Sequence, residues 1–131
     1  MKSRLRILSV AVVGSLLVLS APASALAVGP SVVTKSTCTQ GTNAMLTLSH
    51  DDGHVEAEME LHADKAGHVW KVRFYNEGVR ELTVSQRTNS SDGGGTLSVS
   101  RLLADHGGTD AITATATNQV TKERCVVRAS I

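Results

Sequence analysis

The chain has 131 residues, of which 41% are hydrophobic and only 2% aromatic, and its formal net charge is +1. Its thirteen Lys and Arg include Lys2, Arg4 and Arg6, so beyond the N-terminal segment ten remain against twelve Asp and Glu, a formal charge of −2. That balance predicts no basic field for nucleic acid. The roughly 104 residues that follow the segment match one ordinary domain and are too few for two independent cores.

The N-terminal segment has the pattern of a cleavable secretory signal peptide. Its basic start is followed by an apolar run over residues 7–19 and then by small residues. The run holds about 13 residues before Pro22, whereas a membrane-spanning helix needs about 20. We therefore expect a signal peptide over residues 1–27, cleaved after Ala27 or, as the alternative, after Ala25, and no membrane span in the mature protein.

The only two cysteines, Cys38 and Cys125, lie near the two ends of the part that follows the signal peptide. An even number of cysteines in an oxidising compartment predicts a disulfide bond between them. The bond would close a loop of 87 residues, and chain-entropy reasoning gives about 4–5 kcal/mol of stabilisation. The alternatives are a metal site, which lacks a CxxC pair, and a free thiol, which would need a cysteine without a mate.

Residues 28–37 contain Gly29 and Pro30 and show no clean period, so they predict a flexible leader. From Cys38 onward apolar and polar residues alternate, which is typical of half-buried strands. Strands are expected over 44–49, 54–62, 69–75, 79–87, 96–103, 111–117 and 124–131. About seven short strands with turn signals between them predict an all-β sandwich domain over residues 38–131.

Two segments of this domain have a distinctive composition. The strand 69–75 carries all three aromatic residues of the chain, and a domain with so few is expected to bury the largest. Trp70 is therefore predicted to be a core anchor rather than a ligand platform. Residues 89–95 read NSSDGGG and are expected to form the most flexible loop.

Glu56, Glu58 and Glu60 alternate with apolar residues and would lie on one strand face at intervals of about 6.5–7 Å. We call these three residues the acidic row. One interpretation is a surface for a basic partner or a divalent cation, together with Asn89 and Asp92 of the glycine-rich loop. The other is a solvated face. Alternate residues of one strand are too far apart to chelate a single ion unless a neighbouring strand contributes.

The partners of the acidic row depend on how its strand is arranged relative to the strand 69–75. In a hairpin of the two strands, Glu60 would lie opposite Lys71 and Glu58 opposite Arg73, and both faces would be satisfied. An immunoglobulin-type sandwich would send the two strands to opposite sheets, and these ion pairs would not form. The sequence leaves both arrangements open.

Histidines and aspartates around the Gly53 turn offer a weak metal motif: His50, Asp51, Asp52 and His54. The loop lacks the acidic alternation of an EF-hand, and hydrogen bonds within a turn explain the same residues. No metal ligand is therefore predicted. The sequence also lacks GxSxG, HExxH and a phosphate-binding glycine loop, so no catalytic residue and no cofactor is predicted.

Several of these features together resemble bacterial immunoglobulin-like domains. The lone Trp70 on the third strand and the segment 108–118, leading through Thr121 and Glu123 to Cys125, are similar to the strands of such domains. More narrowly, the chain resembles small secreted proteins of actinobacteria. The residues that carry this resemblance are, in chain order, Asp51-Asp52-Gly53, Glu56, Glu58, Glu60, Trp70, Val72 and Asn76-Glu77-Gly78. The resemblance covers residues 38–129 and implies an immunoglobulin-like β-sandwich without indicating an activity.

These observations predict a secreted, non-catalytic β-sandwich module that binds an extracellular or cell-envelope protein, either free in the medium or at the cell wall. One alternative is an inhibitor of a secreted hydrolase, which would present a stiff loop; the three adjacent glycines argue against it. Another is an extracellular divalent-metal binder, which would require His50, His54, His62 or His68 to converge.

Overall fold

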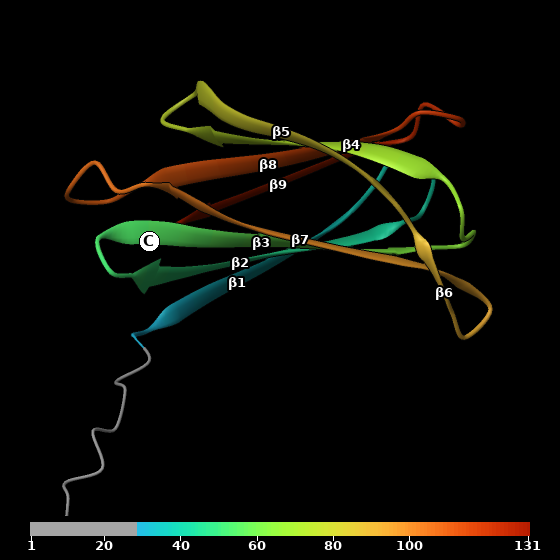
Figure 1. The fold of residues 1–131 in the computed structure, drawn as a ribbon, viewed down its shortest axis with the longest axis horizontal. Helices are drawn as coiled ribbons and strands as arrows, with labels where there is room; N and C mark the ends of the chain where they lie inside the picture. The colour runs from blue at the N-terminus through green and yellow to red at the C-terminus, as the bar shows by residue number, and fades with distance from the viewer. Residues whose placement is uncertain (1–28) are drawn as a thin grey trace, which may run out of the picture.

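The computed structural model describes residues 29–131, so the predicted signal peptide lies outside the described residues. These residues form two antiparallel sheets packed face to face, which Figure 1 shows as two layers. The prediction of an all-β sandwich is confirmed. The strands are β1 (Ser31–Thr37), β2 (Asn43–Asp51), β3 (His54–Ala63), β4 (Val69–Asn76), β5 (Val79–Arg87), β6 (Asn89–Ser91), β7 (Gly94–Ala104), β8 (Ala111–Asn118) and β9 (Arg124–Ser130).

Sheet A has the strand order β1-β2-β3-β7-β6, and sheet B has the order β5-β4-β8-β9. The chain crosses from sheet A to sheet B after β3, returns after β5 and crosses again after β7. Without β1, these orders match the A-B-E-D and C′-C-F-G sheets of immunoglobulin-type sandwiches. The structure therefore has the immunoglobulin-like arrangement, with β1 as an additional edge strand.

The strand of the acidic row, β3, and the strand of Trp70, β4, lie in opposite sheets. The hairpin register is therefore not formed, and β3 pairs with β2 and β7 instead. Each of the two strands buries every second residue, and the two buried faces meet in the core. Packing both apolar faces against each other forces the polar faces to point to opposite sides of the molecule.

The core lies between the two sheets and consists almost entirely of the inward apolar residues of their central strands. Its largest fully buried side chains are Trp70, Phe74, Leu46, Leu48, Met59, Leu61, Leu97, Leu103 and Ile112. Trp70 is 0% exposed, as the core-anchor prediction requires.

Residues 31–37 form the edge strand β1, so the prediction of a flexible leader is wrong for these residues. The strand pairs with β2 along its whole length, from Ser31 opposite Ser49 to Thr37 opposite Asn43. Its inward positions are only half-buried, and polar residues occupy two of them, Thr34 and Ser36. A strand with polar residues at inward positions lacks the alternation on which the sequence argument depends.

The predicted flexible loop over residues 89–95 is a hairpin made by β6 and the start of β7. Its glycines allow close packing. A Cβ atom on Gly95 would lie 2.5 Å from the carbonyl oxygen of Lys65 and 2.8 Å from the Cα atom of Ala66. A Cβ atom on Gly94 would lie 2.4 Å from the carbonyl oxygen of Ala63. The last two glycines of the segment therefore pack against the β3–β4 connection, whereas residues 89–93 are exposed.

Replacing Gly95 with alanine is expected to lower the free energy of unfolding by about 1–3 kcal/mol, the usual range for overpacking. The added methyl group meets backbone atoms, which cannot move aside as a flexible side chain would. Urea unfolding of the variant measures the effect. Gly29→Ala is the control, because nothing lies within 4 Å of a Cβ atom there and no change is expected. Equal stability of both variants with the parent would contradict the close approach.

Candidate functional site

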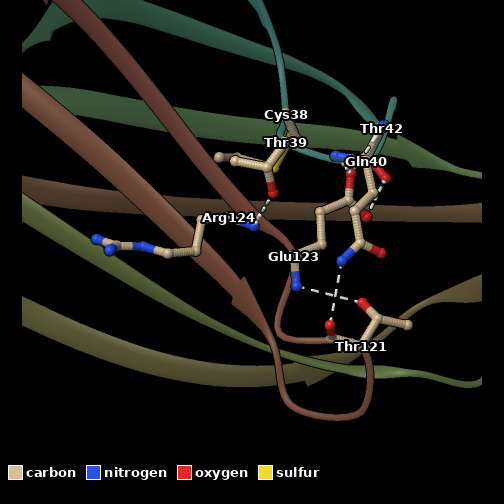
Figure 2. The surroundings of a disulfide bond; sticks show 8 residues. Cys38, Thr39, Gln40, Thr42, Thr121, Glu123 and Arg124 are labelled. Atoms are coloured by element: carbon tan, nitrogen blue, oxygen red, sulfur yellow. Dashed lines mark hydrogen bonds between the residues drawn. A yellow bond between two sulfur atoms is a disulfide. The ribbon is translucent and has the colours of Figure 1, made fainter.

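A disulfide bond between Cys38 and Cys125 joins the end of β1 to β9, as predicted, and Figure 2 shows its surroundings. Because these strands belong to different sheets, the bond ties sheet A to sheet B at one side of the sandwich. The inter-sheet disulfide of antibody domains instead joins the B and F strands in the core. A disulfide at this position indicates an oxidising, extracellular environment.

Beside the disulfide, a buried carboxylate holds the β1–β2 hairpin against the β8–β9 turn. Glu123 is 5% exposed and accepts hydrogen bonds from the backbone nitrogens of Gln40 (3.1 Å) and Thr42 (3.0 Å) and from the Thr42 hydroxyl (2.9 Å). Thr39 and Arg124 add two further hydrogen bonds between the same segments, both of 3.0 Å (Figure 2). No pattern in the sequence predicts these hydrogen bonds, which stabilise the fold.

Replacing Glu123 with alanine is expected to cost about 2–4 kcal/mol of stability, because two buried backbone N–H groups and a hydroxyl lose a charged acceptor. Glu123→Gln keeps an acceptor oxygen in the same place and is expected to recover at least half of that loss. Thermal or urea unfolding of the two variants with the disulfide intact measures both effects. An alanine variant as stable as the parent would show that the carboxylate contributes nothing.

The histidines considered as metal ligands do not converge. His54 begins β3 and His62 lies near its end, about 26 Å apart at a rise of about 3.3 Å per residue. His50 lies 3.6 Å from an Asp105 oxygen, and His62 lies 2.8 Å from a Glu60 oxygen. Within residues 29–131, no group of three or more His, Cys, Asp or Glu side chains is arranged to hold a metal ion.

A buried polar pair lies at the end of the sandwich where β7 leads into β8. Asp110 is 1% exposed and accepts a 2.6 Å hydrogen bond from the side-chain amide of Asn76, which is fully buried. The same amide donates to the carbonyl oxygen of Ala104 at 3.0 Å. The backbone of Asp110 exchanges two hydrogen bonds with Ile131. This pair therefore anchors the β7–β8 connection and the C-terminal residue.

The acidic row lies on the outward face of β3, the central strand of sheet A. Two of its carboxylates are held by serine hydroxyls of the neighbouring strand β7: Ser100 donates to Glu56 at 2.7 Å and Ser98 to Glu58 at 2.6 Å. The remaining carboxylate, Glu60, contacts a histidine. Hydroxyl donors fix the direction of the carboxylates and leave their negative charge in place.

The residues of the predicted interaction surface all belong to sheet A. Asn89 and Asp92 belong to the β6–β7 hairpin at the edge of sheet A, and Asn89 pairs with Thr96. Asp92 lines an open groove with Asp64 and His62, which lies one position beyond the acidic row on the outward face of β3. Because His62 also contacts Glu60 of the acidic row, the groove of the hairpin adjoins one end of the row on the same sheet.

The outward face of sheet B carries the opposite charge. Every Lys and Arg on the strands of this sheet has its side chain on the outward face: Lys71 and Arg73 on β4, Arg80 and Arg87 on β5, and Arg124 and Arg128 on β9. We call these six residues the basic face. The other outward positions hold mainly Thr and Ser, with Val69, Val126 and Tyr75, and no Asp or Glu.

The strand register makes the basic face one continuous surface. Lys71 lies opposite Thr117 of β8, and Thr117 lies opposite Arg124 of β9. At the other end of the face, Arg80, Tyr75, Thr113 and Arg128 form a row across all four strands. Small hydroxyl side chains therefore separate the cations of β4 from those of β9.

No Lys or Arg in the described part of the chain lies within 4 Å of a carboxylate, and each ion pair found there involves a histidine. The pairing of Lys71 with Glu60 and of Arg73 with Glu58 is absent because the strands lie in opposite sheets. The net charge does not reveal the basic face, because it averages over two faces that the fold separates.

A groove of about 640 Å³ lies over β1 and β2 beside His62. It belongs to sheet A and does not reach the basic face.

Residues 29–131 contain no helix of the length and apolarity that a membrane crossing needs.

Comparison of the chain with protein-family models, with curated proteins and with solved structures finds no match in any of the three. The geometry of the charged faces is therefore the basis for proposing a function.

Proposed function

We propose that the mature protein is a secreted, non-catalytic binding module that attaches to an anionic surface through its basic face. The signal peptide expected over residues 1–27 would direct its export, and a disulfide is compatible with that destination. Its location would be the extracellular space or the cell envelope. No cofactor is part of the proposal.

The observation that carries the proposal is the absence of carboxylate partners for the cations of sheet B within residues 29–131. Surface cations of a folded protein are usually interspersed with anions. Here Lys71 and Arg73 are half-buried side chains in the middle of a face without any Asp or Glu. Guanidinium groups offer paired N–H donors that match carboxylate and phosphate oxygens. The carboxylates of the acidic row, in contrast, each contact a serine or a histidine side chain.

Binding of the mature protein to immobilised poly-L-glutamate tests the proposal. We expect binding at about 20 mM salt that is largely lost at about 500 mM, because surface charges are screened over a few ångströms at high ionic strength. The variant Lys71→Gln/Arg73→Gln should bind at least about tenfold more weakly, which corresponds to about 1.4 kcal/mol.

The matched control is Lys65→Gln/Arg101→Gln, which removes the same charge from two exposed positions outside the basic face. This control should bind within about twofold of the parent. Equal weakening by both pairs would attribute the binding to net charge, and unchanged binding of the Lys71/Arg73 variant would exclude the basic face.

A further inference from the structure

We infer that the anionic surface recognised by the basic face is the acidic row of a second copy of this chain, so that copies stack with sheet B of one molecule on sheet A of the next. The inference deepens the proposed function and rests on it. It names one partner, and a foreign anionic polymer is the alternative that the test separates.

The two faces have matching spacing. Glu56, Glu58 and Glu60 project from the central strand of sheet A at intervals of two residues, about 6.5–7 Å. Lys71 and Arg73 project from β4, an interior strand of sheet B, at the same interval. A pleated strand laid over another strand can therefore place successive carboxylates beside successive cations.

The surroundings of both central strands allow close approach. Four of the six residues opposite the acidic row are serine or threonine, namely Ser98 and Ser100 of β7 and Thr47 and Ser49 of β2, and the other two are Met45 of β2 and the exposed Leu102 of β7. Beside the cations of β4 lie mainly threonines and serines of β8 and β5. Small hydroxyl side chains add hydrogen-bonding groups without holding the two sheets apart.

The charges near each face support the same pairing. Lys35 is the only Lys or Arg among the outward residues of sheet A within the described chain, and it lies on the edge strand β1. It is separated from Glu60 by Met45 of β2, so it does not neutralise the row. The arginines Arg124 and Arg128 of β9 widen the basic face beyond β4.

The proposed contact between copies is not symmetric. The two surfaces are different, so the contact is heterologous, and each added copy leaves one free acidic face and one free basic face. Growth is therefore open-ended instead of stopping at a dimer. A single sheet face lies at the low end of interface sizes, so the association should be weak, concentration-dependent and sensitive to salt.

Charge reversal tests the inference by sedimentation velocity on the mature, disulfide-bonded protein. We expect the parent to show a rising average mass with concentration at about 20 mM salt and to be monomeric at about 500 mM. Lys71→Glu/Arg73→Glu has carboxylates on the central positions of both faces, and Glu58→Lys/Glu60→Lys has cations on the central positions of both. Each variant alone should associate at least about tenfold more weakly than the parent. Mixed in equal amounts, they should associate again, because acidic faces of one then meet basic faces of the other.

Two further sets of variants complete the test. Lys65→Glu/Arg101→Glu has the same net charge as the basic-face reversal and should associate like the parent. If a reversal variant fails to fold, the neutral pairs Lys71→Gln/Arg73→Gln and Glu58→Gln/Glu60→Gln should weaken association at least about fivefold.

A parent that stays monomeric at low salt but binds poly-L-glutamate through Lys71 and Arg73 would overturn the second copy as the partner and leave the proposed function standing. Loss of both activities would refute both. Failure of the mixed reversal variants to associate would also overturn the inference.

Discussion

Replacing Cys38 and Cys125 together with alanine is expected to lower the free energy of unfolding by about 4–5 kcal/mol. The disulfide spans a sequence separation of 87, so its removal gives the unfolded chain many more conformations. Small domains have about 5–15 kcal/mol in total, so this variant should keep only a small reserve. Urea unfolding, followed by the fluorescence of Trp70, measures the difference.

Reduction of the parent protein should reproduce the effect of the double variant, because both remove the same cross-link. The bond also closes one side of the sandwich, where Glu123 adds its own hydrogen bonds. A loss below about 1 kcal/mol in both experiments would contradict the entropic account. It would mean that the hydrogen bonds around Glu123 hold the two sheet edges together without the bond.

Replacing Trp70 with alanine is expected to cost about 3–5 kcal/mol, the range for removing a large buried aromatic side chain. Trp70 is 0% exposed and is the largest of the fully buried side chains. No other Trp exists to fill the space, and the chain has one Phe and one Tyr. Urea unfolding followed by circular dichroism measures the loss, because the fluorescent group is removed.

Two further variants separate packing from hydrogen bonding at this position. The indole nitrogen of Trp70 has no hydrogen-bonding partner in the described part of the chain. Trp70→Phe should therefore cost less than half as much as Trp70→Ala, because it keeps most of the ring and removes an unpaired buried donor. Tyr75→Ala, on the outward face of the same strand, is the control and should have a small effect. A similar cost for Tyr75→Ala and Trp70→Ala would contradict the buried role of Trp70.

The central strands could be predicted from the sequence because their inward residues are apolar and their outward residues are polar. The predicted strands 54–62 and 69–75 each differ from β3 and β4 by a single residue at one end. Strand β1 could not be predicted, because tertiary pairing rather than its own pattern holds it. The glycines of residues 89–95 predict a flexible loop, because a sequence alone does not show whether glycines provide conformational freedom or allow close packing.

The charged faces could be predicted only in part. The alternation identified Glu56, Glu58 and Glu60 as outward residues. It did not reveal whether they face Lys71 and Arg73, because that depends on the sheet to which each strand belongs. If β3 and β4 had formed a hairpin, these charges would have neutralised each other. Their placement in opposite sheets keeps Glu58 and Glu60 apart from Lys71 and Arg73 and produces the two faces.

The role of Glu123 was also beyond the sequence. Its hydrogen-bonding partners Gln40 and Thr42 lie 83 and 81 residues away along the chain. A glutamate two residues before a cysteine has no local pattern that distinguishes a buried acceptor from a solvated charge.

The central claim is that an anionic ligand binds the basic face, and amide chemical-shift mapping tests it most directly. Titration of the isotopically labelled mature protein with poly-L-glutamate at low salt should shift the amides of Lys71, Arg73 and Thr115, with Arg124 and Arg128 following. At a protein concentration too low for self-association, the amides of the acidic row should stay unchanged. Shifts confined to sheet A or to the loops, or none at all, would contradict the account.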